Sequence, residues 1–270
     1  VLLFIILVLL LSIPAVQTRL GKYATERINK DFGTNINIEK VGLQFNGDVE
    51  LKNIYIEDYK KDTLVNILEL NTSILSYRKL YQNKLTFGDV DIIGLNLNIK
   101  TYLGEDQTNL DVFVNKLDSD NPSTSENVFL LSSSDISIIN SRFKLSDENK
   151  ETVDVLKFYD LNINATDFLI LGPKVSARIN QLTFNDSRGV SVQNMTTNFS
   201  YSRTSMVFDN LRIETPNSEL NGDLKFKYDR EDLQYFEDRV ALIANFDNSK
   251  IALNELNTFY NEFGINEVAR

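Results

Sequence analysis

The 270-residue sequence contains no cysteine and no histidine. Without cysteine the chain forms no disulfide bond, offers no thiolate ligand to a metal and has no residue for lipoprotein-type acylation. Without histidine it lacks the commonest general base at neutral pH and the commonest metal ligand of proteins. These two absences argue against an enzyme and against a bound metal or cofactor.

Recognisable motifs of enzymes and metal sites are also missing. Carboxylates cluster where solvated turns or strand edges are expected, at Asp89 and Asp91, Asp147 and Glu148, and Glu57 and Asp58. The stretch DSDN at 118–121 begins like a calcium loop, but Pro122 takes the next ligand position and no glycine follows. The serines at 132–134 lie in no nucleophile elbow. We therefore predict no catalytic, cofactor-binding or metal-binding residues.

Positive charge is in short supply as well. The chain has 28 lysines and arginines against 38 aspartates and glutamates, which gives a net charge of -10. Nucleic-acid binding needs clustered Lys and Arg to displace the counterions of the phosphates, so we predict that nucleic acid is not a partner. The hydrophobic content of 42% is enough for a folded chain with a real core.

The sequence opens in the apolar run VLLFIILVLLLSIPAV, residues 1–16. Sixteen residues span about 24 Å as a helix, which is short of the ~30 Å hydrocarbon core of a membrane. Because the chain does not begin with Met, we expect missing residues to complete the span, so that residues 1–18 form a truncated transmembrane anchor. The alternative is the apolar region of a signal peptide, although Ala15, Val16 and Gln17 make a poor cleavage site.

The charges that follow this run bear on orientation. Arg19, Lys22, Arg27 and Lys30 lie directly after it. The more basic flank of a membrane span usually stays in the cytoplasm. Either the missing leader is more basic still and the body is exported, or the rest of the chain is cytoplasmic.

A helix is expected next, over residues 19–33. Apolar residues recur every four positions at Leu20, Ala24, Ile28 and Phe32, and Gly33 is a typical helix end. Such an amphipathic helix has two possible roles. It packs on the end of the following sheet, or it lies in the membrane interface beside the anchor.

Beyond Gly33 the sequence is dominated by short alternating stretches typical of strands, such as INIEKVGLQF, LVNILELNTSIL, KLTFGDVDIIGLNLNIK and DISIINSRFKL. Two gaps are typical of helices or loops, at 111–117 and 254–263. The polar linker at 118–127 is the best boundary between a first β section, 34–117, and a second, 128–270, which we expect to continue beyond this fragment. The predicted fold is mainly β, with few short helices.

The stretch GDVELKNIYIED changes phase in its middle. Strict alternation would put Val49 and Leu51 on one face and Ile54 and Ile56 on the other, so a bulge or bend that exchanges the faces is predicted near Asn53. The same pattern, a polar residue followed by an apolar residue, a spacer and usually a second apolar residue, begins at Asn53, Asp160, Gln181, Asn194 and Asn210. The simplest explanation of each polar residue is that it tolerates the backbone of a bulge.

So much strand with so little helix leaves the apolar face of the sheet without a cover. The sheet must close into a barrel, stack on itself as a sandwich, or bind something apolar. Repeated phase changes favour a strongly curled antiparallel sheet with an apolar inner face, because bulges bend and twist strands.

The order of parts resembles the N-terminal region of TamB-like proteins of the AsmA-like superfamily. The resemblance lies in the anchor, the amphipathic helix that leads into FGTNINIEKVGLQFNGDVELKNIYIED, the stretches KDTLVNILELNTSIL and KLTFGDVDIIGLNLNIK, and the terminal VALIANFDNSKIALNELNTFY. It covers essentially the whole chain. No single motif is diagnostic, and the order of the elements carries the resemblance.

The resemblance implies a long β-groove with a hydrophobic interior, held in the bacterial inner membrane by a single span and crossing the periplasm. It implies phospholipid transport to the outer membrane, and translocation and assembly of outer-membrane proteins with a BamA-type barrel partner, which would bind through a missing C-terminal part. It carries no catalytic residues. The alternative from the residues alone is an exported structural or adhesive β-sandwich domain that transports no lipid.

A groove of this kind would shield acyl chains passively, because each buried methylene is worth about 0.8 kcal/mol and a sixteen-carbon chain on the order of 10 kcal/mol. Parity within each strand groups the candidates for its lining, although the sequence alone does not fix which parity faces inward. They are Ile54, Ile56, Ile93, Leu95, Leu97, Leu161, Ile163, Leu182, Phe184, Leu211, Ile213, Leu224 and Phe226. In a closed sandwich the same residues would form the core.

Overall fold

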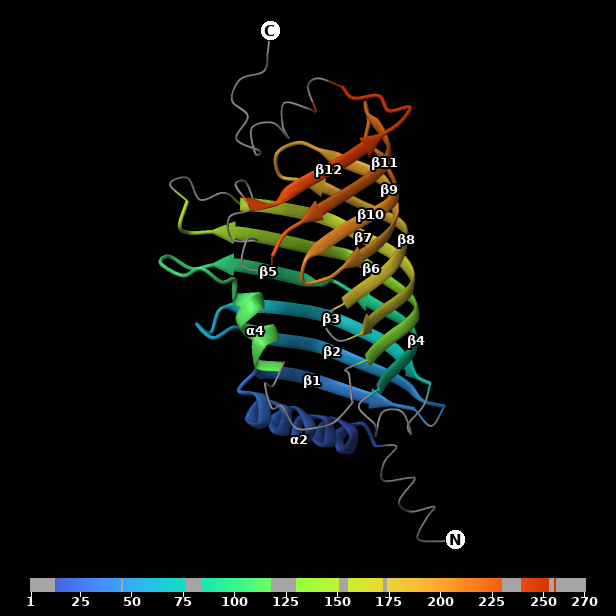
Figure 1. Cartoon of the computed structure of the whole chain (residues 1–270). Helices are drawn as coiled ribbons and strands as arrows, with labels where there is room; N and C mark the ends of the chain where they lie inside the picture. The colour runs from blue at the N-terminus through green and yellow to red at the C-terminus, as the bar shows by residue number, and fades with distance from the viewer. Residues whose placement is uncertain are drawn as a thin grey trace.

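The computed structural model describes residues 13–44, 46–75, 84–117, 130–150, 155–171, 174–229, 239–252 and 255. In these residues twelve strands form one curved sheet with two helices at its margin (Figure 1). The helices are α2 (Pro14–Phe32) and α4 (Asn109–Leu117). The strands are β1 (Asn35–Leu43), β2 (Asp48–Glu57), β3 (Thr63–Ile74), β4 (Lys84–Ile93), β5 (Asn96–Thr101), β6 (Leu130–Asp147), β7 (Val155–Leu171), β8 (Lys174–Asp186), β9 (Ser191–Tyr201), β10 (Ser205–Glu214), β11 (Glu219–Lys227) and β12 (Ala241–Phe246).

The predicted mainly-β fold with one long curled sheet and few helices is confirmed. The strand order is β1-β2-β3-β4-β6-β7-β8-β9-β10-β11-β12, and β5 pairs with β3 and β6. Strands β4 and β5 are successive parts of one path bent at Gly94, whose φ is 67°. The antiparallel expectation is wrong at one place, since β6 runs parallel to both β4 and β5. Parallel neighbours need a crossover connection, and residues 102–129, which include α4, provide it.

The predicted helices compare as follows. Helix α2 ends at Gly33 as expected, with φ 63° at that residue, but it begins at Pro14 and so includes residues 14–18 that were assigned to the anchor. Helix α4 begins two residues before the predicted 111–117. Residues 1–12, the linker at 118–127 and the predicted helix or loop at 254–263, apart from Glu255, lie outside the described residues. Within the described part of the chain, no helix is long and apolar enough to cross a membrane.

Helix α2 lies along the outer edge of β1 and satisfies its backbone groups with side chains. Three α2 side chains each bond both the N–H and the C=O of one β1 residue, at donor–acceptor distances from 2.5 to 3.4 Å: Gln17 with Leu43, Thr18 with Val41, and Asn29 with Ile36. A bare edge strand exposes a row of unpaired groups that invites pairing with another chain. The helix therefore closes this edge without adding a strand.

The close approach of α2 to β1 requires a glycine. A Cβ atom at Gly21 would lie 2.4 Å from Cγ2 of Val41. We expect Gly21→Val to displace the helix and lower the free energy of unfolding by about 1–3 kcal/mol, measured by urea denaturation. Amide exchange at Ile36 and Val41 should accelerate. Glu26→Val, at an exposed position of the same helix, is the matched control. It should change the free energy of unfolding and the amide exchange rates less than Gly21→Val does. Equal effects of the two variants would contradict the close packing of Gly21 on Val41.

The strands share a bend in which a polar residue adopts a left-handed backbone. Asn53, Asn140, Asp160 and Asn210 have φ between 51° and 52°, and all four are exposed. The residue after each is buried: Ile54 is 6% exposed, Ser141 0%, Leu161 9% and Leu211 2%. We call the set of these four bends, together with Gly94, the crease.

The crease exchanges the faces of the strands. Ile138 pairs with Ile163, and Ser141 pairs with Leu161. Leu161 and Ile163 alternate on one face of β7, so Ile138 and Ser141 share that face although they are three residues apart. The strand pairings show the same exchange of faces in β4 and β5, which pair with β6, and then in β3 and β2. Leu51 and Ile56 therefore lie on the same face, as a face-exchanging bend predicts.

The repeated sequence pattern marks the crease only in part. Asn53, Asp160 and Asn210 adopt the left-handed conformation, whereas Gln181 and Asn194 do not. The register between β8 and β9 still shifts beside Gln181, between Ile179 and Leu182, so a bulge forms there without a positive φ. The pattern did not single out Asn140, because the polar Ser141 follows it. It did not single out Gly94 either, because the pattern begins with Asn, Asp or Gln and not with glycine.

The crease predicts a strong residue preference at position 210. Asn210 has φ 52°, where a β-branched residue is strained by about 1–2 kcal/mol and glycine is not. We expect Asn210→Val to lower the free energy of unfolding by about that amount and Asn210→Gly to change it by only a few tenths. Asp209→Val, at the exposed neighbouring residue, is the control. Equal destabilisation by valine at 209 and 210, in urea denaturation, would rule out strain at the crease as the cause.

Candidate functional site

An unbroken line of apolar side chains crosses the sheet. Each member lies opposite the next in the strand register, and all lie on one face: Val41, Leu51, Leu70, Ile92, Ile138, Ile163, Leu182, Met195, Ile213 and Leu220. Neighbouring strands are about 4.8 Å apart, so this apolar ladder of ten strands extends over roughly 43 Å. Every member is partly exposed to solvent.

The opposite face of the same strands is polar. Directly beside the apolar ladder in sequence, and across the register from one another, lie Gly42, Glu50, Asn71, Asp91, Ser137, Asn164 and Gln181. Because successive residues of a strand point to opposite faces, these side chains lie on the other side of the sheet. The sheet therefore has one apolar face and one polar face across most of its width.

A second apolar line follows the same face beyond the crease. It is formed by Ile36, Ile56, Val65, Leu97, Phe143 and Phe158. The Phe158 ring lies 5.5 Å from that of Phe143 and 4.1 Å from that of Phe184, between ring centres. Offset and tilted contacts at such distances are favourable aromatic pairs. A continuous aromatic cluster therefore lines this limb of the sheet.

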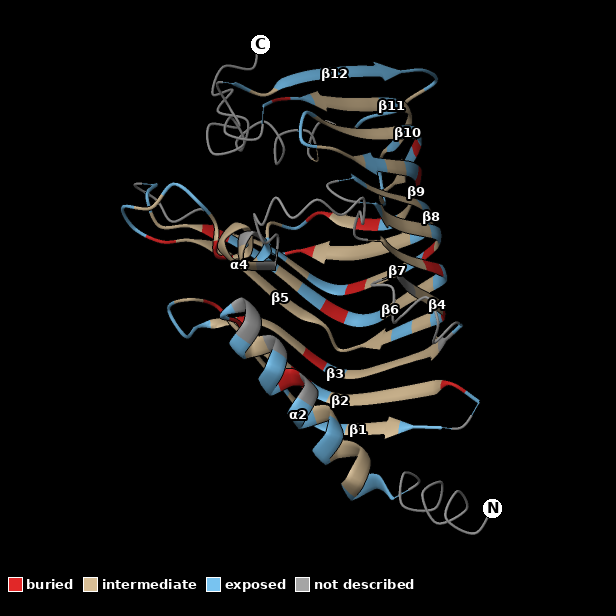
Figure 2. Cartoon of the chain, turned by 60° about the horizontal axis from the view of Figure 1, so that its bottom comes forward, coloured by how far each residue is buried: buried red, intermediate tan, exposed pale blue. Residues whose placement is uncertain are grey.

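The apolar face is the inner side of the bend. Ile54, Leu161 and Leu211 are almost fully buried, although the described residues contain no second sheet that could cover them. Among the described residues, it is the sheet's own curvature that brings other side chains over these positions. Away from the crease most of the strand surface is half-buried, and fully buried positions are confined to short stretches (Figure 2). The inner face is thus a concave apolar surface that no described layer fills.

The structure places twelve of the thirteen predicted lining residues on this inner face. Leu161, Leu211 and Ile54 are buried at the crease, and the other nine are half-buried. Ile93 is the exception, because it pairs with Glu69 and Ile139 on the polar side of the sheet. The reason is Gly94, whose left-handed φ switches the phase between Ile93 and Leu95, so the two do not share a face.

Sequence reasoning missed seven of the ten members of the apolar ladder. The omitted members of the apolar ladder are Val41, Leu51, Leu70, Ile92, Ile138, Met195 and Leu220. The available signal was the phase change itself. If the faces of the strand are exchanged at Asn53, Leu51 lies on the same face as Ile54, which is the inner face.

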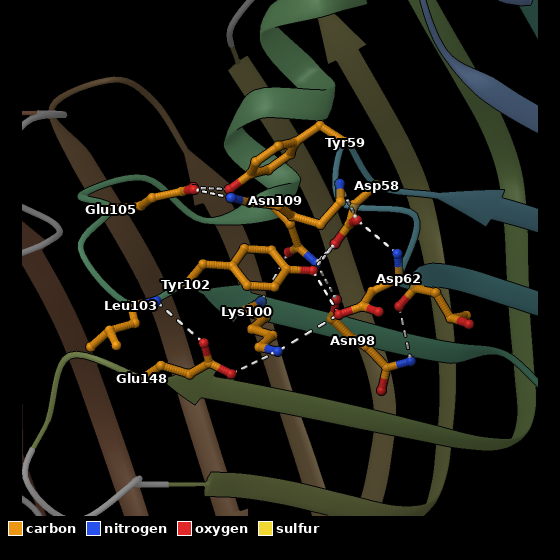
Figure 3. A network of polar contacts seen from close by, with 12 residues as sticks. Asp58, Tyr59, Asp62, Asn98, Lys100, Tyr102, Leu103, Glu105, Asn109 and Glu148 are labelled. Atoms are coloured by element: carbon orange, nitrogen blue, oxygen red, sulfur yellow. Dashed lines mark hydrogen bonds and ion pairs between the residues drawn. The ribbon is translucent and has the colours of Figure 1, made fainter.

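A polar network lies at one rim of the sheet (Figure 3). Its centre is the Asp58 carboxylate, which is only 6% exposed. It accepts hydrogen bonds from the Tyr102 hydroxyl at 2.7 Å, the Asn109 amide at 3.0 Å, and the backbone N–H groups of Lys60 at 2.8 Å and Asp62 at 3.0 Å. Burial by itself raises the pKa of Asp58, but these four donors outweigh it and hold the pKa below its usual value.

Tyr102 and Lys100 extend the network along β5. Burial and the neighbouring carboxylates of Asp58 and Asp62 raise the pKa of the Tyr102 hydroxyl, so it remains a hydrogen-bond donor. The Lys100 ammonium lies 4.4 Å from the centre of the Tyr102 ring and 2.7 Å from a Glu148 carboxylate oxygen. The hydrogen bond to Glu148 raises the pKa of Lys100 despite partial burial. The tyrosine ring is thus held between a cation on its face and carboxylates at its hydroxyl.

The network joins four parts of the chain. Asp58 follows β2, Tyr102 follows β5, Asn109 begins α4, and Glu148 follows β6. At its other end α4 is tied to α2, because the Lys116 ammonium donates to the Gly33 carbonyl at 2.9 Å. Within the described residues, no group of three or more acidic side chains has metal-binding geometry. The hydrogen bonds of Asn109 and Lys116 make the network a clamp that holds α4 along the rim.

The clamp predicts a specific pH dependence of stability. Because the folded-state pKa of Asp58 lies below the ordinary value of about 3.9, its contribution is present above that pH and is lost as the pH falls through the folded pKa. Asp58→Asn should lower the free energy of unfolding by about 1–3 kcal/mol at pH 7. The difference from the unmodified chain should shrink below about pH 4.

Urea denaturation over a series of pH values measures this difference. Asp106→Asn, at an exposed carboxylate in the same loop, is the control and should leave stability nearly unchanged at neutral pH. A difference between Asp58→Asn and the unmodified chain that stays constant down to about pH 3 would show that the charge of Asp58 does not hold the clamp.

No protein-family model matches the chain, and no curated protein matches it at a significant level.

Proposed function

We propose that this chain forms part of a hydrophobic groove that binds phospholipid acyl chains and lets them move along it. The observation that carries the proposal is the apolar ladder, which runs over ten strands on a concave face that no described layer covers. Soluble proteins rarely leave so large a contiguous apolar surface without an occupant. Acyl chains fit such a surface because they need only apolar contact along their length.

The length of the apolar ladder and the energy of its apolar contacts both support a lipid as the occupant. The ladder is roughly 43 Å long, whereas the hydrocarbon core of one membrane leaflet is about 15 Å thick. An acyl chain drawn from a leaflet would therefore lie along the ladder with room to spare. Each methylene placed against the ladder is worth about 0.8 kcal/mol, so the chain as a whole gains on the order of 10 kcal/mol relative to water.

The composition of the ladder favours movement over tight binding at one point. Its members are valine, leucine, isoleucine and methionine throughout, so the contact energy is similar from strand to strand. A similar energy at every strand leaves no deep well that would trap the lipid. The polar face on the other side of the strands keeps the outer surface in water.

The wider setting rests on the resemblance to TamB-like proteins. In that setting the groove is held at the bacterial inner membrane by a single span, crosses the periplasm and delivers phospholipid to the outer membrane. A role in translocation and assembly of outer-membrane proteins, with a BamA-type partner bound through a further part of the protein, belongs to the same proposal. The curled single sheet is compatible with this architecture, whereas a two-sheet sandwich does not form among the described residues.

Photo-crosslinking in cells tests the groove directly. A photoreactive amino acid at Leu97 or Ile163, on the inner face, should trap phospholipid, and the same residue at Asn96 or Asn164, on the outer face, should not. The pairs are adjacent in sequence, so each control shares the strand and depth of its partner. Adducts at both faces, or at neither, would contradict the groove and favour a domain that binds other molecules.

A second arm separates an open groove from a filled core. Ile163→Asp, combined with the photoreactive amino acid at Leu97, should fold with a nearly unchanged urea midpoint, because a half-exposed charge stays hydrated, and should lose the lipid adducts at Leu97. A charge buried without a partner costs several kcal/mol, so global unfolding of this variant would show that the inner face is a closed core. Asn164→Asp, on the outer face, controls for the added charge.

A further inference from the structure

Helix α2 has a second face that the sheet does not use. The side that packs on β1 carries Gln17, Thr18, Gly21 and Asn29. Each residue advances about 100° around a helix, so Tyr23 lies about 200° from Gly21 and points away from the sheet. Tyr23 is 66% exposed. Leu20, the first residue of the predicted apolar stripe, is 52% exposed and therefore does not pack against the sheet.

This outer side is basic in an acidic protein. Helix α2 carries four cationic side chains against two acidic ones, whereas the whole chain has a net charge of -10. Arg19 and Lys30 are exposed and lie within about 40° of Tyr23 around the helix, whereas the exposed Glu26 and Lys22 lie farther from it, at about 60° and 100°. Exposed aromatic and aliphatic residues interspersed with lysine and arginine are the composition of helices that lie on anionic membrane surfaces. Each basic residue near such a surface strengthens binding about fivefold.

The helix also connects the apolar N-terminal sequence to the start of the apolar ladder. Residues 1–13 contain a single polar residue, Ser12, and lead directly into α2. On its other side Gly21 packs against Val41, the first member of the ladder. If the outer side of α2 lay on a surface, that surface would therefore be one helix diameter, about 10 Å, from the β1 end of the groove.

We infer that the outer side of α2, with Leu20 and Tyr23, lies on a membrane surface rich in anionic phospholipid, and that acyl chains enter the groove at its β1 end. The point of entry rests on the proposed function, whereas the contact between α2 and the membrane stands independently of it. The assignment commits to a lipid surface because the exposed cations complement anionic headgroups and the exposed apolar residues reach below them.

The absence of tryptophan from the chain gives a clean test. Tyr23→Trp introduces one fluorophore at an exposed position of the full chain, purified in detergent and reconstituted into vesicles. In vesicles of phosphatidylcholine with phosphatidylglycerol, we expect a blue-shifted emission and strong quenching by lipids brominated in the upper acyl chain. Ile243→Trp in β12, at the other end of the sheet, opposite Lys225 on the outer face and 41% exposed, is the matched control and should show neither.

Charge removal completes the test. Arg19→Gln, Lys22→Gln and Lys30→Gln combined in the Tyr23→Trp chain should reduce quenching at least severalfold, while amide exchange at Ile36 and Val41 shows that α2 still packs on β1. No quenching of the introduced tryptophan, or equal quenching in pure phosphatidylcholine with and without the three changes, overturns the inference. Lipid adducts at Ile163 in the same chain would then show that the groove stands although the membrane contact of α2 does not.

Discussion

The structure depends on the left-handed backbone at the crease. A strand with regular alternation that bends sharply would turn its apolar residues outward on one side of the bend. At Asn53, Asn140, Asp160 and Asn210 a positive φ places an exposed residue before a buried one, and the pairings show that both limbs keep their apolar residues inside. Asn and Asp tolerate this conformation at lower cost than other non-glycine residues. In β2, β6, β7 and β10 this backbone conformation both bends the strand and keeps its apolar residues on one face, whereas β8 and β9 pair through a bulge without a positive φ.

The other stabilising interactions lie at the margins of the sheet. Side chains of α2 satisfy the backbone of β1, and the network around Asp58 ties α4 to the ends of β2 and β5. Both arrangements leave the inner face uncovered by any described layer. The edges and the rim thus hold the shape of the sheet without any contact that requires a described layer over the apolar face.

Much of the fold follows from local pattern. Alternation of apolar and polar residues predicts the strands, Gly33 predicts the end of α2, and twelve of the thirteen proposed lining residues share the inner face. The error at Ile93 arose because parity was carried across Gly94, where the backbone reverses it. Ladder residues such as Leu51 and Ile92 were missed because the face exchange at Asn53 and Gly94 was not applied to the residues that precede it. The parallel pairing of β6 was not predictable either, since it depends on where a long connection returns to the sheet.

By itself, the sequence determined the elements: a β-rich acidic chain without histidine or cysteine, an amphipathic helix at its start, and polar residues at points where strands bend. Only the tertiary structure decided which face is inner, that α2 meets β1 through the polar side chains of Gln17, Thr18 and Asn29, and that Asp58, Tyr102 and Asn109 come together. The physical reason is the range of the interactions. Backbone preference acts over a few residues, whereas strand register, curvature and the rim network join residues far apart in the chain.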